Sequence, residues 1–125
     1  MLKTLSLGFN KLTSIFDLSQ MADLTDLNVN NNQLSLLPNL PLNLISLHLK
    51  SNHLTSLPQE LSQLSKLIDL DASFNNISAL PVEMFTTSPG LVNLKGLNLS
   101  NNSLKSLDAE ISNLPSLKVY CISKA

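Results

Sequence analysis

Leucines recur along the chain in a fixed pattern instead of being scattered. Five blocks follow L-x-x-L-x-L-x-x-N-x-L, and Ala72 is the one departure at the fixed apolar positions. The second and third leucines of a block lie two residues apart, which is the spacing of one face of a strand. Each block therefore predicts a short strand with one apolar face. The blocks begin at Leu2, Leu24, Leu44, Leu67 and Leu94, and a partial sixth block begins at Leu117.

The distances between the blocks predict how the strands are connected. Successive block starts lie 22, 20, 23, 27 and 23 residues apart, which leaves too few residues for a long crossover helix. One strand cannot bury its apolar face alone, so we expect neighbouring coils to stack and their strands to form a parallel sheet. The expected fold is a curved α/β solenoid, with about six short strands on the concave face and short helical or extended return segments on the convex face.

The return segments differ in the local structure that they predict. Residues 58–64 begin with Pro and continue with apolar residues three apart, which favours a short helical turn. Residues 108–111 favour a capped turn, whereas the prolines of 38–41 favour an extended segment. The 27-residue block carries about four extra residues at 85–90. We expect them to bulge at the outer side or at an edge, either as a tolerated surface insertion or as a contact loop.

An asparagine follows each strand at the same position of the block. There the chain leaves the strand, and its backbone groups lose their partners in the sheet. A buried side-chain amide both donates and accepts hydrogen bonds, so we expect it to satisfy backbone groups on its own and adjacent coils. The column contains Asn10, Asn32, Asn52, Asn75 and Asn102.

This pattern resembles the leucine-rich repeat family over essentially the whole chain. The 23-residue block from Leu44 resembles repeats of intracellular scaffolds and bacterial repeat proteins, and the 20-residue block from Leu24 resembles repeats of secreted bacterial effectors. The resemblance implies one leucine-rich repeat domain over 1–125. It also implies a function in binding a protein partner through the concave face.

Composition narrows the range of partners. The chain has 30 Leu, a formal net charge of −1 and no cluster of its eight lysines, which argues against nucleic-acid and membrane binding. One cysteine cannot form an internal disulfide, and no Cys/His group has metal-ligand spacing. We therefore expect no metal and no cofactor. The lone Cys121 and the absence of Cys-rich ends predict a cytoplasmic location, with a secreted bacterial effector as the open alternative.

The outward strand positions define the candidate binding site. Its centre is acidic, with a histidine and a lysine between the acids, which suits a basic or amide-rich protein surface; a merely solvated face is the alternative. Phe9 and Phe74 come just before the asparagine, and either anchor a partner or fold over the edge of the core. The residues expected to bind a protein partner are Asp26, Asn28, Asn30, His48, Lys50, Asp69, Asp71, Asn98 and Ser100.

The same face argues against catalysis. Ser46 and His48 point the same way and lie about 7 Å apart, beyond hydrogen-bond reach between a nucleophile and its base. The chain has three glycines and no glycine-rich phosphate loop. We therefore predict that the protein is not an enzyme.

The first and last blocks lack polar caps, so the inward side chains of Leu5, Leu7, Tyr120 and Ile122 are expected to be poorly covered. This predicts a piece of a longer protein. It also leaves open self-association through the ends, or a targeting domain of a larger multidomain enzyme.

Overall fold

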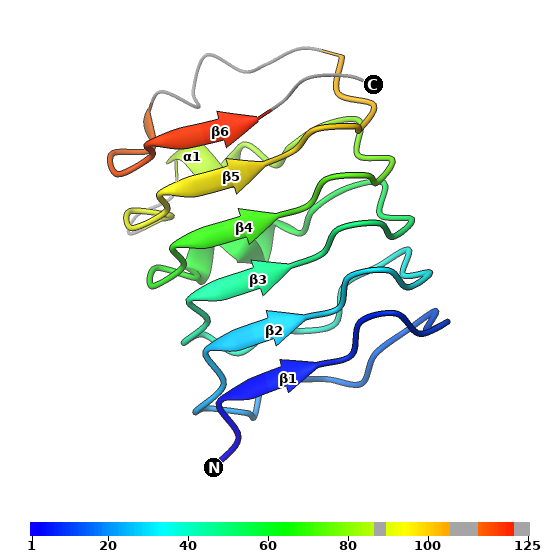
Figure 1. Cartoon of the computed structure of the whole chain (residues 1–125). Helices are drawn as coiled ribbons and strands as arrows, with labels where there is room; N and C mark the ends of the chain where they lie inside the picture. The colour runs from blue at the N-terminus through cyan, green and yellow to red at the C-terminus, as the bar shows by residue number, and fades with distance from the viewer. Residues whose placement is uncertain (87–89, 106–112, 122–125) are drawn as a thin grey trace.

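The computed structural model describes residues 1–86, 90–105 and 113–121, the last three by their backbone alone. The chain winds as a solenoid, and each coil contributes one short strand to a parallel sheet (Figure 1). The parallel sheet and the solenoid predicted from the repeat are confirmed. In sheet order the strands are β1 Thr4–Ser6, β2 Asp26–Asn28, β3 Ser46–His48, β4 Asp69–Asp71, β5 Gly96–Asn98 and β6 Val119–Cys121.

The strands pair in register, so equivalent positions of successive blocks lie side by side. The middle leucine of each strand follows this rule: Leu27 pairs with Leu47, Leu47 with Leu70, and Leu70 with Leu97. The outward residues on either side of these leucines therefore form straight rows across the sheet.

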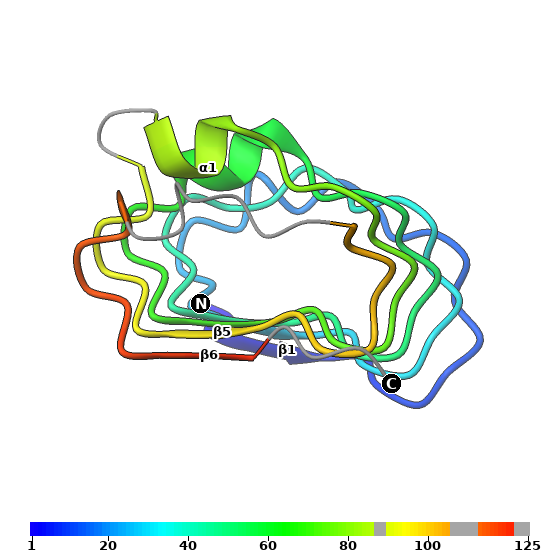
Figure 2. The same cartoon turned by 90° about the horizontal axis from the view of Figure 1, so that it is seen from above.

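The core lies between the sheet and the return segments, which enclose it when the molecule is seen along the stack (Figure 2). Leu47 and Leu49 are fully buried, like the equivalent residues of the neighbouring central coils. Leu5 and Leu7 are only half-buried, because no described coil covers the outer side of β1. The prediction of poor coverage is confirmed for these two leucines; the side chain of Tyr120 and the whole of Ile122 lie outside the described part of the chain.

Four asparagines of the column join their coil to the one before it, whereas Asn10 is exposed and bonds only within its own coil, contrary to our expectation. The Asn52 amide nitrogen donates to the carbonyl oxygens of Val29 at 3.0 Å and Leu49 at 3.1 Å. Its oxygen accepts the Leu34 N–H at 3.1 Å. Because Val29 and Leu34 belong to the preceding coil, the amide satisfies backbone groups of two coils, as predicted. Asn32, Asn75 and Asn102 repeat this arrangement.

The return segments lie on the side of the solenoid opposite the sheet (Figure 2). The third coil forms a short 3-10 helix, η1 Gln59–Gln63, directly after the extended Pro58. The fourth coil forms α1 Glu83–Thr86, which packs against η1. Residues 38–41 form no helix, as their prolines predict.

The prediction of an outward bulge at 85–90 is wrong at its first residue. Phe85 lies in α1 and, like its neighbour Met84, is buried in the core. The helix uses these apolar side chains to cover the core beside η1. Residues 87–89 and the turn predicted at 108–111 lie outside the described residues. No helix of the described residues is long and apolar enough to cross a membrane.

Candidate functional site

The open face of the sheet carries the nine predicted site residues on β2 to β5 and at the exits of these strands. In the first outward row, the register places Asp26 beside Ser46 and Ser46 beside Asp69. The second row is polar along the same four strands, and it consists of Asn28, His48, Asp71 and Asn98. The strand exits carry Asn30, Lys50 and Ser100, each of which follows a residue of the second row by two positions in the sequence.

Three residues of the second row, Asn28, Asp71 and Asn98, accept hydrogen bonds from their own strand exits. The Asp71 carboxylate accepts the Ser73 N–H at 3.0 Å and the Ser73 hydroxyl at 2.7 Å. The Asn98 side-chain oxygen accepts the corresponding groups of Ser100 at 3.1 Å and 2.7 Å. These bonds close the turn after each strand, so each side chain has a structural task that our sequence analysis did not predict.

Asn30 forms a link between two coils. Its N–H donates to the Asn28 side-chain oxygen at 2.9 Å, and its own side-chain oxygen accepts the Lys50 N–H at 2.8 Å. Asn28 and Asn30 therefore fix the exits of β2 and β3, and each keeps only part of its hydrogen-bonding capacity for a partner.

His48 and Asp69 differ from these residues. Within the part of the chain that the structure describes, no hydrogen bond or ion pair engages the His48 ring or the Asp69 carboxylate, and Asp69 is exposed. Asp26 has one long contact, from the Thr25 hydroxyl at 3.4 Å. The free polar groups of the face are thus concentrated on β3 and β4.

A hollow of about 300 Å³ opens on the face beside these free groups. Gly96 has no side chain, and the Asp69 carboxylate reaches over it: a Cβ at Gly96 would lie 2.7 Å from the Asp69 Oδ1 atom. Gly96 was not among the predicted site residues. The sequence could have indicated it, because it is a glycine at an outward strand position where the neighbouring strand has Asp69. The lining residues are His48, Asp69, Leu70, Asp71, Gly96, Leu97 and Asn98.

Phe9 and Phe74 lie at the turn after their strands, with φ of 57° and 56°. Phe9 is 83% exposed and does not fold over the edge of the core, whereas Phe74 is 50% exposed, so half of its surface is covered. The Lys50 Nζ atom lies 5.6 Å from the Phe74 ring centroid, within cation–π range. Phe74 therefore borders the open face, and its role as a partner anchor stays a prediction.

The chemistry of the face fits recognition of a surface. Among the residues that the structure describes, no three His, Cys, Asp or Glu side chains come close enough together to hold a metal ion. The face instead combines carboxylate, imidazole, ammonium and amide groups above an apolar floor.

The stacked strands, their leucine core and the asparagine column define a leucine-rich repeat solenoid. The Leucine Rich Repeat family model matches residues 43–64 and 93–114. The chain belongs to the leucine-rich repeat family. Such folds generally serve as protein–protein interaction modules and are typically non-catalytic.

Comparison with known proteins agrees with this classification. A leucine-rich repeat protein of Leptospira interrogans has a solved structure that matches with a TM-score of 0.68 and 40% sequence identity, over 78% of this chain and 25% of that chain. The probable inactive serine/threonine-protein kinase roco10 of Dictyostelium discoideum is 38% identical over 86% of this chain and 4% of that protein. Osteomodulin of Bos taurus is 37% identical over 83% of this chain and 25% of that protein. The chain thus spans a quarter or less of each.

Proposed function

We propose that the chain is a non-catalytic module that binds a protein partner through the open face of the sheet, which we take to be the concave face of a curved solenoid. One observation carries the proposal: the hollow beside Gly96 lies next to His48 and Asp69, whose polar groups are free of hydrogen bonds within the described chain. A surface that only needs to be soluble does not require a hollow with an apolar floor.

The charges on the face favour a basic or amide-rich segment of the partner. Asp26, Asp69 and Asp71 contribute three carboxylates, against the single ammonium group of Lys50. A lysine or arginine side chain fits the hollow because its aliphatic stem can cover Leu70 while its charged end reaches Asp69. Phe74 would then contact the same segment from the rim of the face.

The predictions of location, of excluded partners and of a targeting role have less support from the structure. The cytoplasmic location and the absence of nucleic-acid and membrane binding stay predictions. The match to 4% of a protein named as a probable inactive kinase is consistent with a targeting domain in a larger chain.

The half-buried Leu5 and Leu7 favour a second candidate function, self-association through the first coil. Analytical ultracentrifugation over a wide concentration range tests it. A chain that stays monomeric at the highest concentration would exclude self-association.

The binding proposal is tested with a phage-displayed library of random peptides selected on the whole chain. We expect the selected peptides to be rich in Lys and Arg. We also expect Asp69→Lys to weaken their binding at least about tenfold, the effect of losing one charge-assisted contact and gaining repulsion.

Asp23→Lys is the matched control, because Asp23 is an exposed aspartate just before the second block rather than on the open face. The proposal fails if no peptide is enriched, or if the two variants reduce binding equally.

A further inference from the structure

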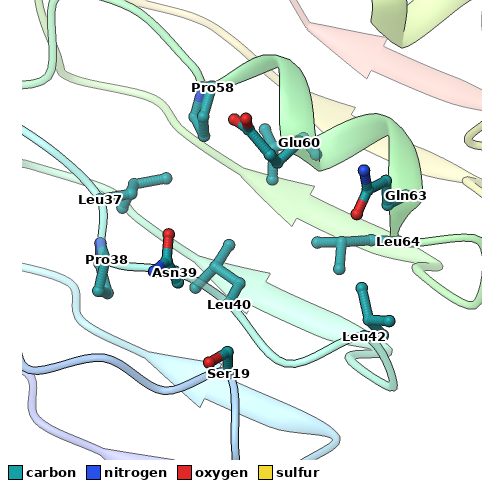
Figure 3. Close-up of a pocket in the computed structure, with 11 residues that line it drawn as sticks. Ser19, Leu37, Pro38, Asn39, Leu40, Leu42, Pro58, Glu60, Gln63 and Leu64 are labelled. Atoms are coloured by element: carbon teal, nitrogen blue, oxygen red, sulfur yellow. The ribbon is translucent and has the colours of Figure 1, made fainter.

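A groove of about 420 Å³ lies on the return side of the solenoid, between the second and third coils (Figure 3). We propose that it docks an extended segment of a partner protein in which an apolar side chain is next to a lysine or arginine. This groove and the open face of the sheet lie on opposite sides of the solenoid, so the proposal is independent of the function proposed above.

The groove follows from the unequal lengths of neighbouring coils. The second block has 20 residues and the third has 23, and the prolines at 38 and 41 keep the shorter return segment extended. In the third coil the extra residues form η1, which has α1 packed against it on its other side. A step therefore remains between η1 and the extended segment, and Figure 3 shows residues of both elements around it.

The floor of the groove is apolar and its rim carries an exposed leucine. Leu61 and Leu64 of the third coil are about 1% exposed, and Leu40 of the second coil packs against the core while it lines the groove. Leu42 lines the same groove with 59% of its surface exposed. Burial of one further aliphatic side chain between Leu40 and Leu42 removes apolar surface of both partners from water, which is the main source of affinity at such a site.

The charge around the groove predicts that the docked segment carries a basic residue. Among the described residues that line it, Glu60 is the one ionisable group, and none of them is a lysine. The Asp17 carboxylate lies just beyond the other edge, where it accepts the N–H of the lining residue Ser19 at 2.8 Å and lies 3.4 Å from the Asn39 amide nitrogen. The nearby Lys66 donates instead to the Asn43 side chain at 2.9 Å. Carboxylates on both edges favour a basic residue beside the apolar anchor.

The polar rim suits a peptide backbone. The side-chain amides of Asn39 and Gln63 flank the groove from opposite sides, and both residues are exposed. Each amide can donate to and accept from the main chain of an extended segment. A basic apolar peptide thus meets an apolar floor, two amides and two carboxylates.

The test is an NMR titration of the uniformly ¹⁵N-labelled whole chain with three short capped peptides. Their sequences are Lys-Leu-Lys, Glu-Leu-Glu and Lys-Ser-Lys. We expect Lys-Leu-Lys to shift the amide signals of 37–42 and 59–64, whereas the acidic peptide and the serine peptide bind at least about tenfold more weakly. Equal binding of Lys-Leu-Lys and Glu-Leu-Glu would overturn the charge argument.

Two variants with matched controls assign the effect to the groove. We expect Leu42→Ser to reduce the affinity for Lys-Leu-Lys about fivefold, and Leu36→Ser, a 74% exposed leucine that does not line the groove, to leave it unchanged. Glu60→Gln should remove the preference for the basic peptide, and Glu83→Gln should keep it. The proposal is wrong if the groove signals do not respond to Lys-Leu-Lys. It is also wrong if they shift with protein concentration alone, because a second copy of the chain would then cover the groove.

Discussion

Gly96 and Asp69 lie so close on neighbouring strands that a Cβ at Gly96 would be 2.7 Å from the Asp69 Oδ1 atom. The contact atom is at the end of an exposed side chain, which can rotate away at little cost. We expect Gly96→Ala to change the free energy of unfolding by less than about 1 kcal/mol, because the lower chain entropy of the unfolded alanine variant offsets the displacement of Asp69.

The same substitution should fill the hollow and reduce the affinity for face-selected peptides. Isothermal titration calorimetry and urea denaturation measure the two effects separately. Ser56→Ala, at an exposed serine that is not one of the outward strand residues, is the control. If Gly96→Ala binds these peptides as well as the wild type, the hollow is not part of the binding site.

Asn52 should be among the most sensitive polar residues of the chain. Asn52→Ala leaves the buried Leu34 N–H without its side-chain acceptor, and the Val29 carbonyl oxygen keeps only the Asn32 amide as a side-chain donor. We expect a loss of about 3 kcal/mol in the free energy of unfolding, measured by urea denaturation. Asn10→Ala should cost less than about 1 kcal/mol, because Asn10 is exposed and bonds within its own coil. Similar losses in the two variants would contradict the proposed link between coils.

We expect the backbone conformation at Phe9 to lower the free energy of unfolding of the chain. Its φ of 57° is in the left-handed region, which asparagine tolerates better than phenylalanine, and the equivalent position of the next coil is Asn31 with φ of 60°. We expect Phe9→Asn to raise the free energy of unfolding by about 0.5–1 kcal/mol, and Asn31→Phe to lower it by a similar amount. Thermal and urea denaturation measure both. A destabilised Phe9→Asn variant would show that the exposed ring makes a contact that supports the first coil.

Asp17 should titrate at unusually low pH. The Ser19 hydroxyl, the Ser19 backbone N–H and the Asn39 amide hold the pKa of Asp17 below its ordinary value of 3.8. Because the folded-state pKa is lower than the unfolded one, this carboxylate contributes stability above the unfolded pKa. The contribution is lost as the pH falls through the folded-state value.

A ¹³C NMR titration of the Asp17 carboxyl group measures this pKa. Ser19→Ala should move it up towards 3.8, whereas Ser56→Ala, at an exposed serine of another coil, should not. The interpretation fails if Asp17 keeps its low pKa in Ser19→Ala.

The face shows how far the sequence could predict the candidate site. Alternation along each strand places Asp69 and Asp71 outward, and the structure agrees. The pattern does not separate the free Asp69 from Asp71, which is bonded to Ser73. Nor does it assign a role to Gly96, because the hollow needs a glycine and a carboxylate that lie 27 residues apart in the chain (69 to 96) to be neighbours.

The repeating unit, the inward leucines and the asparagine that closes each strand can be read from the chain alone, because each is encoded within one block and periodicity extends it to the next. Only the folded structure shows which polar side chains remain free, where the hollow opens and that a groove lies beside η1. These features depend on contacts between coils. Such contacts are set by the relative lengths of neighbouring blocks and by residues of different blocks, which no pattern within a single block contains.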